Sequence, residues 1–140
     1  MKLPALSVAF LALAISFASA QRKPNPVFAP VEDNPGLPRV LMIGDSISIG
    51  YTLPTRERLE GVANLHRVPT NAGHSGMGIE GLPKWLEKLG GTWDVIHFNH
   101  GLWDLCYRNP EAKTQGTRDK VNGKQTFSVE EYAANLETIV

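Results

Sequence analysis

The sequence predicts an α/β fold, in which a parallel sheet lies between helices in a three-layer α/β/α sandwich. Across residues 39–140, apolar runs of strand length alternate three times with segments of helical character. The first run is continuous rather than alternating, which is typical of a parallel strand covered on both faces. Successive parallel strands need crossover connections, so we expect right-handed crossovers and helices on both faces of the sheet.

The first half of this region supplies two strands. Residues 39–43 form the apolar run, and a helix follows that includes the turn at 56–59 and closes at Gly61. A shorter second strand is predicted over 64–68. The glycine-rich stretch that comes next, 71–78, is expected to be a loop, because glycine disfavours both helices and strands.

The second half repeats the pattern. Leucine and tryptophan recur at helical spacing over 79–89, and Pro83 is expected at the start or in the first turn of that helix. The third strand is predicted over 93–99. Residues 105–127 show no periodicity and are expected to be a long loop. Ser128, with a glutamate three residues later, is a capping box that begins the last helix.

The first 38 residues do not fit the α/β pattern. Residues 1–20 combine a lysine, an apolar stretch and a small-x-small cleavage site, which predicts a secretory signal peptide. We therefore expect a secreted or periplasmic protein with no stable membrane anchor after cleavage. Residues 21–38 carry five of the ten prolines and predict an extended linker, so the domain is expected to cover 39–140.

Composition excludes several classes of protein. Hydrophobic residues make up 42% of the chain and charged residues 20%, which excludes a disordered polyelectrolyte and a multi-pass membrane protein. Cys106 is the single cysteine, so an internal disulfide or a cysteine zinc site is excluded. Fourteen basic residues balance fourteen acidic ones, which argues against a nucleic-acid partner.

Three loops, at 44–48, 71–78 and 99–104, follow the three predicted strands. The carboxyl ends of parallel strands meet at one edge of the sheet, and ligands bind there in open α/β folds. Ser46 lies on a sharp turn beside a helix N-terminus, a position that suits a nucleophile because the helix end stabilises negative charge. The alternative is that Ser46 only caps the helix.

These loops resemble blocks I, II and III of the SGNH (GDSL-type) hydrolases, in the order of that family. The matching motifs are Gly-Asp-Ser-Ile-Ser at 44–48, Asn-Ala-Gly at 71–73 and Gly-Leu-Trp-Asp at 101–104. The pattern is similar to a secreted bacterial branch of the family. The resemblance implies a flavodoxin-like fold and the hydrolysis of acyl or acetyl esters. We expect a small-molecule or carbohydrate ester as substrate, and export together with the aromatic residues Trp103 and Tyr107 favours a carbohydrate.

The resemblance also implies roles for individual residues. Ser46 would be the nucleophile of an acyl-enzyme mechanism, and its amide and that of Gly73 would donate to the oxyanion. Asp45 would brace the loop, with an ordinary turn aspartate as the alternative. Asp104 would support the third block. No metal or organic cofactor is implied.

Two departures from the family pattern affect the predicted site. Trp103 stands where the third block has an asparagine of the oxyanion hole, so Asn99 is the preferred substitute and Asn71 the second. The Asp-x-x-His block of the catalytic base, which follows two further strands, is not in the sequence. His74 and His100 lie in the site loops, but each follows the wrong strand for the base.

We therefore expect 39–140 to be the N-terminal part of a longer hydrolase domain whose C-terminal strands are missing. The last predicted helix ends within its apolar stripe, which favours the same interpretation. The 140-residue chain is expected to be inactive. The alternative function is a catalytically dead, exported module that binds a carbohydrate or another ligand. A third hypothesis, nucleotide or phosphate binding, has less support from the sequence, because the glycine spacing fits neither a dinucleotide-binding loop nor a phosphate-binding loop.

Overall fold

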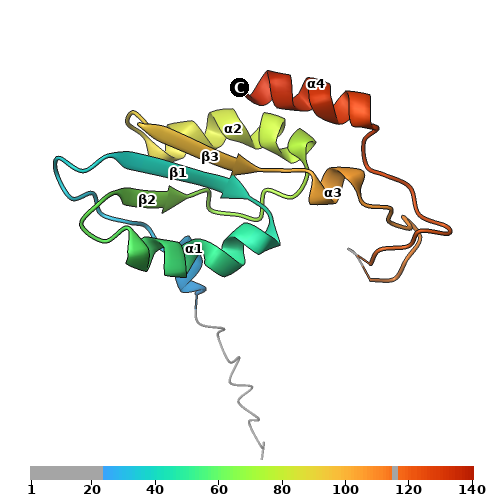
Figure 1. Cartoon of the computed structure of the whole chain (residues 1–140), viewed down its shortest axis with the longest axis horizontal. Helices are drawn as coiled ribbons and strands as arrows, with labels where there is room; N and C mark the ends of the chain where they lie inside the picture. Colours follow the sequence, from blue (N-terminus) through green and yellow to red (C-terminus); the bar gives the residue numbers. More distant parts are fainter. Residues whose placement is uncertain (1–23, 115–116) are drawn as a thin grey trace, which may run out of the picture.

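The computed structural model describes residues 24–114 and 117–140. Three strands form an open sheet, namely β1 (Arg39–Gly44), β2 (Asn64–Arg67) and β3 (Val95–Asn99). Both strand pairs are parallel and the order is β2-β1-β3, so the first strand lies in the middle (Figure 1). The predicted α/β class with a parallel sheet is confirmed, and the predicted signal peptide at 1–20 lies outside the described residues.

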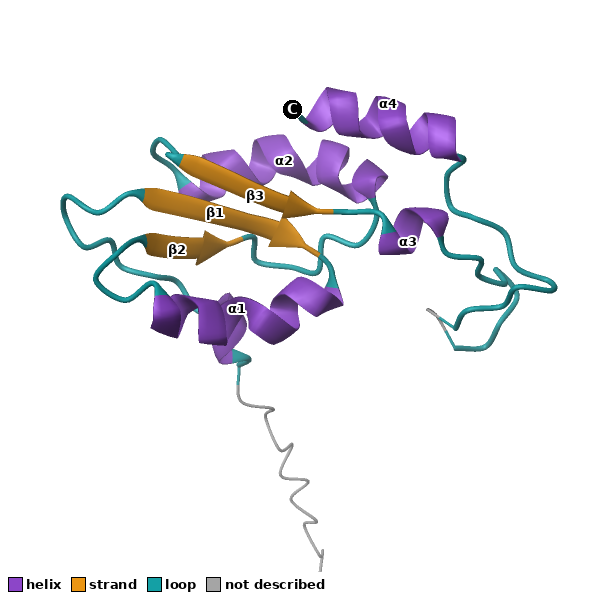
Figure 2. Cartoon of the chain, viewed as in Figure 1, coloured by secondary structure: helices purple, strands orange, loops and turns teal. Residues whose placement is uncertain are grey.

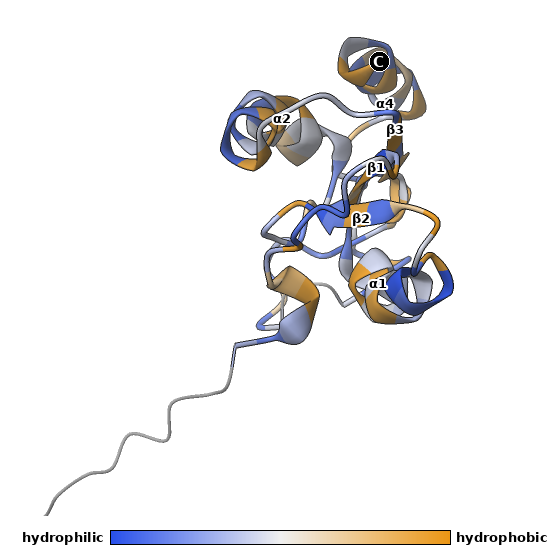
Figure 3. Cartoon of the chain, turned by 90° about the vertical axis from the view of Figure 1, so that its left-hand side faces the viewer, coloured by the Kyte–Doolittle hydropathy of each residue, from blue (hydrophilic) through white to orange (hydrophobic). Residues whose placement is uncertain are grey.

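Helices lie on both faces of this sheet. They are α1 (Ser46–Arg58), α2 (Ser75–Leu89), α3 (Leu102–Leu105) and α4 (Val129–Ile139), with a short 3-10 helix, η1 (Pro26–Phe28), before β1. Helices α1 and α2 cover opposite faces, and α4 packs beside α2, beyond the β3 edge (Figure 3). This arrangement is compatible with three α/β/α layers. None of the described helices is long and apolar enough to span a membrane.

The apolar core lies between the sheet and α2. Leu41 and Ile43 of β1 are fully buried there with Val68 and Ala72 from the segment after β2. Leucine and tryptophan side chains of α2 pack against them, together with Trp93. The helical stripe predicted over 79–89 therefore faces the sheet.

β3 begins at Val95, two residues later than predicted, and it is the exposed strand of the sheet. Val95 is 51% exposed and Ile96 is 45% exposed. β3 lies at the edge of the sheet, and α1 packs on β1 and β2 instead. Trp93 precedes the strand, and its ring lies 4.1 Å from the Arg39 guanidinium and packs against His66.

The predicted loop at 71–78 is wrong in its second half, because α2 begins at Ser75. Pro83 consequently lies inside the helix and not in its first turn. Close contacts with two other segments of the chain explain why residues 76 and 78 are glycines. A Cβ on Gly76 would meet the ring of Phe127 at 2.8 Å, and one on Gly78 would meet His100 at 2.7 Å. Close packing, and not a loop conformation, requires small residues here.

The predicted loop at 105–127 is largely confirmed, and α3 occupies the turn just before it. Residues 106–114 and 117–127, called the long loop below, extend from α3 at the carboxyl ends of the strands (Figure 2). The loop returns to α4 at Ser128, whose hydroxyl accepts a hydrogen bond from the Glu131 amide at 3.1 Å. The Glu131 carboxylate accepts one from the Ser128 amide, so the predicted capping box is confirmed.

The described part of the proline-rich segment packs on the domain, so the extended linker expected over 21–38 is wrong for residues 24–38. Val27 is buried. The Asn34 amide donates to the Asn64 side chain at 2.8 Å, and Asp33 lies 2.6 Å from His66. Polar side chains thus attach a segment with few apolar residues.

Candidate active site

The three strand ends meet, as predicted. The Ala72 amide donates to the Gly44 carbonyl at 3.0 Å, which joins the loop after β2 to the end of β1. Gly44 is also the register partner of Asn99 at the end of β3. The loop after β3 is joined to the loop after β2 by His100, whose Nδ1 donates to the Gly73 carbonyl at 3.3 Å.

Ser46 lies exposed at this junction, as the first residue of α1. Asp45 is the N-cap, because its buried carboxylate accepts a hydrogen bond from the Ile47 amide at 2.9 Å. The alternative in which Ser46 only caps the helix is therefore wrong, and Asp45 braces the turn. Neither the hydroxyl nor the amide of Ser46 is hydrogen-bonded within the described residues. Both are free to contact a ligand.

Arg67 stabilises this turn by hydrogen bonds. Its guanidinium donates to the Ser48 hydroxyl at 2.7 Å and to the Gly44 carbonyl at 3.0 Å, and the side chain is buried. The Ser48 hydroxyl donates in turn to the Asp45 carbonyl at 2.7 Å. Burial lowers the pKa of Arg67, but an arginine still keeps its charge. Five acceptors within 3.5 Å, three of them carbonyls, offset part of its desolvation.

Sequence reasoning missed Arg67. The signal was an arginine inside a predicted strand, where an unpaired charge is costly unless hydrogen bonds satisfy it. The side chain faces α1, where Thr52 and Ser48 accept its hydrogen bonds. A polar stripe of α1 at the spacing of these two residues is the pattern that could have identified it.

The candidate oxyanion donors differ in whether they already donate a hydrogen bond within the protein. Gly73 has a positive φ of 49°, and its amide donates to the Asn71 side chain at 3.1 Å. That bond uses the Gly73 N–H and the Asn71 Oδ1, so it occupies the Gly73 donor but not the Asn71 NH₂ group. The Asn99 side chain is exposed and makes no hydrogen bond within the part of the chain that the structure describes. Trp103 lines the cleft beside the long loop, and the Arg108 guanidinium stacks on its ring, so Asn99 remains the predicted substitute donor and Asn71 the second.

Asp104 is fully buried and joins the second and third loops. One carboxylate oxygen accepts the Ser75 amide at 2.8 Å and the Ser75 hydroxyl, and the other accepts the Gly101 amide at 2.9 Å. Asn135 of α4 donates to the Ser75 hydroxyl at 2.9 Å. The carboxylate therefore lies at the N-termini of α2 and α3, where amide groups stabilise its charge. Its place fits the predicted supporting role.

No histidine is hydrogen-bonded to Ser46 among residues 24–114 and 117–140. His74 is the N-cap of α2 and accepts the Met77 amide at 3.2 Å, while His97 lies 3.3 Å from the Tyr51 hydroxyl. The Nε2 atom of His100 is buried without a partner. The remaining histidine, in β2, bonds Asp33. The structure thus places the Ser46 turn, Gly73 and Asn99 at the same edge of the sheet, and no histidine in the described part of the chain is hydrogen-bonded to Ser46.

Tyr132 of α4 supports the third loop. Its hydroxyl donates to the His100 carbonyl at 3.0 Å. Burial, and then the negative charge of Asp104, raise the pKa of Tyr132. The neutral phenol is therefore favoured, and it keeps the proton that this hydrogen bond needs.

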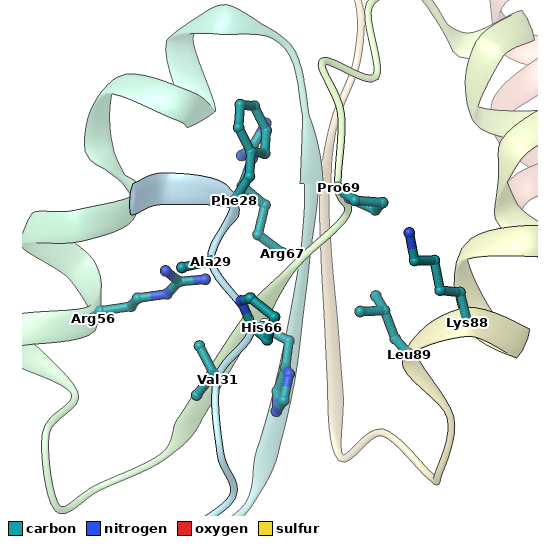
Figure 4. Close-up of a pocket in the computed structure, with 10 residues that line it drawn as sticks. Phe28, Ala29, Val31, Arg56, His66, Arg67, Pro69, Lys88 and Leu89 are labelled. Atoms are coloured by element: carbon teal, nitrogen blue, oxygen red, sulfur yellow. The ribbon is translucent and has the colours of Figure 1, made fainter. Parts of the chain in front are cut away.

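Two clefts flank the strand ends and the β2 edge. One, of about 220 Å³, lies between Phe28 and Val31 on one side and Lys88 and Leu89 on the other (Figure 4). Its Arg56 side chain already donates to two carbonyls, so this cleft is the seam between the N-terminal segment and the domain. The other, of about 670 Å³, lies under the long loop. No cluster of three metal-ligating side chains occurs within the described residues.

Comparison of the chain with protein-family models, with curated proteins and with solved structures finds no match.

Proposed function

We propose that the chain carries the nucleophile and oxyanion part of an exported serine ester hydrolase of the SGNH/GDSL type. The observation that supports this most is Ser46: an exposed serine with a free hydroxyl and a free amide, at the start of a 13-residue helix. A serine needed only for structure would be expected to use its hydroxyl as a cap or a turn bond. The substrate proposed is a small-molecule or carbohydrate ester.

In the proposed reaction the Ser46 Oγ attacks the ester carbonyl, and its proton passes to a base. The negative charge on the carbonyl oxygen is stabilised by the Ser46 amide and the Asn99 side chain. The Gly73 amide can join them only after it leaves Asn71. Collapse of the tetrahedral adduct breaks the ester C–O bond, releases the alcohol and leaves an acyl-serine, which water then hydrolyses.

The proposal assigns the base to an Asp-x-x-His block after Val140, as the resemblance implies. A serine hydroxyl attacks slowly at neutral pH without an adjacent base. We therefore expect the 140-residue chain to turn over esters very slowly.

A catalytically inactive binding module is the second candidate. It is favoured by the absence of a histidine hydrogen bond to Ser46 within the described residues, and by the Asn71 bond that occupies the Gly73 amide. In that case the exposed loops would bind a ligand without reacting with it.

Chemical rescue separates the two candidates. We expect imidazole to raise p-nitrophenyl acetate hydrolysis by the chain above the reaction of imidazole alone, because imidazole can take the place of the base. The Ser46→Ala variant should lose this gain. Thr92→Ala, which removes an exposed hydroxyl that makes no hydrogen bond within the described residues, is the control and should keep it. Equal rates for Ser46→Ala and the unmodified chain would instead favour the binding module.

A further inference from the structure

The N-terminal segment, residues 24–38, lies along the edge strand β2 and forms no strand itself. Asn34 exchanges two hydrogen bonds with the Asn64 side chain, at 2.8 and 3.1 Å, and Asp33 lies 2.6 Å from His66. The segment contains five prolines, and a proline has no amide to donate to a neighbouring strand. Side chains therefore attach this segment to β2.

The same segment places an aromatic ring on Arg67. The centroid of the Phe28 ring lies 5.6 Å from the Arg67 guanidinium carbon, and Figure 4 shows the two side chains side by side. That distance is within the range of a cation–π contact. Phe28 is half-buried and does not belong to the apolar core, so packing in the core does not account for its position.

Arg67 is a buried cation without an ion pair. The residue is 4% exposed, and no carboxylate pairs with it within the described part of the chain. Its hydrogen bonds end on neutral hydroxyl and carbonyl oxygens, and its Nε atom has no partner there. Neutral acceptors offset only part of the cost of burying a charge, and the face of an aromatic ring attracts a cation. The Phe28 ring therefore adds a stabilising contact that the hydrogen bonds do not provide.

The hydrogen bonds of Arg67 in turn fix the turn that carries Ser46. The guanidinium donates to the Gly44 carbonyl at 3.0 Å and to the Ser48 hydroxyl at 2.7 Å, on either side of Ser46 in the sequence. Hydrogen bonds are directional, so their strength depends on where the guanidinium lies. A contact that holds the guanidinium in place therefore also holds the turn.

We propose that Phe28 is a positioning residue for the Ser46 turn and acts through the guanidinium of Arg67. The inference rests on the proposed function in one respect only, namely that Ser46 is the nucleophile. The bonds of Asp33 and Asn34 fasten the segment to β2 and so keep the ring over the guanidinium. The proline-rich segment thus belongs to the proposed site.

Hydrogen–deuterium exchange of the full chain, read by mass spectrometry, measures the order of the turn without any ester chemistry. Phe28→Leu keeps an apolar side chain but removes the aromatic face. We expect it to raise amide exchange over residues 44–50 about fivefold. Phe28→Tyr restores the aromatic face and should exchange as the parent does. Val31→Ala truncates another side chain of the same segment in the same cleft, so it is the matched control and should also match the parent.

Exchange over residues 39–43 of β1 separates a local effect from global unfolding, and it should be the same in Phe28→Leu and in the parent. Three results would overturn the proposal. Phe28→Leu could raise exchange no more at the turn than in β1, Phe28→Tyr could exchange like Phe28→Leu, or Val31→Ala could raise exchange at the turn as much as Phe28→Leu does.

Labelling of Ser46 by a fluorophosphonate in the presence of imidazole measures the consequence for the proposed nucleophile. We expect Phe28→Leu to be labelled about fivefold more slowly than the parent, and Phe28→Tyr and Val31→Ala to be labelled at the parent rate. Equal labelling of Phe28→Leu and the parent would overturn the positioning role. A parent chain without any label on Ser46 would contradict the proposed function, while the exchange result would still decide whether Phe28 holds the turn.

Discussion

The face of the sheet under α2 is packed by apolar side chains, whereas the face under α1 is held by hydrogen bonds around a buried arginine. Leu41 and Ile43 of β1 point toward α2 and are almost wholly buried among other hydrophobic residues. On the other face, Arg67 donates to Ser48 and Thr52 of α1. The same three-stranded sheet thus uses two kinds of packing.

The difference follows from what each face must do. Apolar contacts stabilise in proportion to buried area and have little directional preference. Hydrogen bonds are directional, and those of Arg67 end on the backbone of the turn that carries Ser46. We infer that the α2 face supplies stability and that the α1 face sets the position of the proposed nucleophile.

The largest expected effect on stability is that of Leu41→Ala. The side chain is fully buried in the apolar core, so its truncation should leave a cavity and lower the free energy of unfolding by about 4 kcal/mol. Urea unfolding followed by circular dichroism measures this. At urea concentrations where the variant stays folded, imidazole-dependent ester hydrolysis should remain that of the parent.

Arg67→Met should lower the free energy of unfolding by about 3 kcal/mol, because it leaves the Ser48 hydroxyl and several carbonyls without their charged donor. In contrast to Leu41→Ala, it should also reduce imidazole-dependent hydrolysis in the folded protein. The same urea curves and ester assays apply. If the two variants lose activity equally at equal folded fraction, the two faces do not differ as described.

Asp104→Asn should lower the free energy of unfolding by about 2 kcal/mol. An amide can still accept from Ser75, but its NH₂ group then faces the Gly101 amide, and two donors cannot bond each other. Asp104→Ala provides a comparison that removes both acceptors. Thermal unfolding that is unchanged in Asp104→Asn would show that this carboxylate is not needed to join the two loops.

The smallest expected effect on stability is that of protonating Asp33 at acid pH. The hydrogen bond from His66 holds the pKa of Asp33 below its ordinary value of 3.8, although burial opposes this shift. A carboxylate with a lowered pKa contributes stability above the pKa of the unfolded state, and that contribution is lost as pH falls through the folded value. Water screens a carboxylate that is 40% exposed, so the effect is small.

The comparison is made with Asp33→Asn. We expect the unmodified chain to lose more stability than this variant as the pH falls below about 4. Tryptophan fluorescence measures unfolding at each pH, and Trp93 lies against His66 as a local reporter. Parallel stability curves for the two proteins would contradict the assignment.

The sheet and its loops could be predicted from the sequence because their signals are local. The run at 39–43, the turn that begins at Gly44 and the capping box at Ser128 each depend on residues close together in the chain. The meeting of the strand ends follows from parallel topology alone.

The rest depended on contacts between distant segments. Glycines at 76 and 78 predicted a loop, but the Asp104 carboxylate and the N-cap of His74 stabilise a helix start there. The buried Arg67 depends on acceptors from α1 that a strand sequence does not reveal. At the proposed site, the sequence left open whether Ser46 caps the helix, and only the Asp45 hydrogen bond decided it.

Covalent labelling tests most directly whether Ser46 is a nucleophile whose position is set by the hydrogen bonds under α1. The chain is treated with a fluorophosphonate in the presence of imidazole, and peptide mass spectrometry locates the adduct. We predict a single adduct on Ser46, and its loss in Ser46→Ala. An adduct on any other serine, or no adduct while the protein remains folded, would contradict the claim.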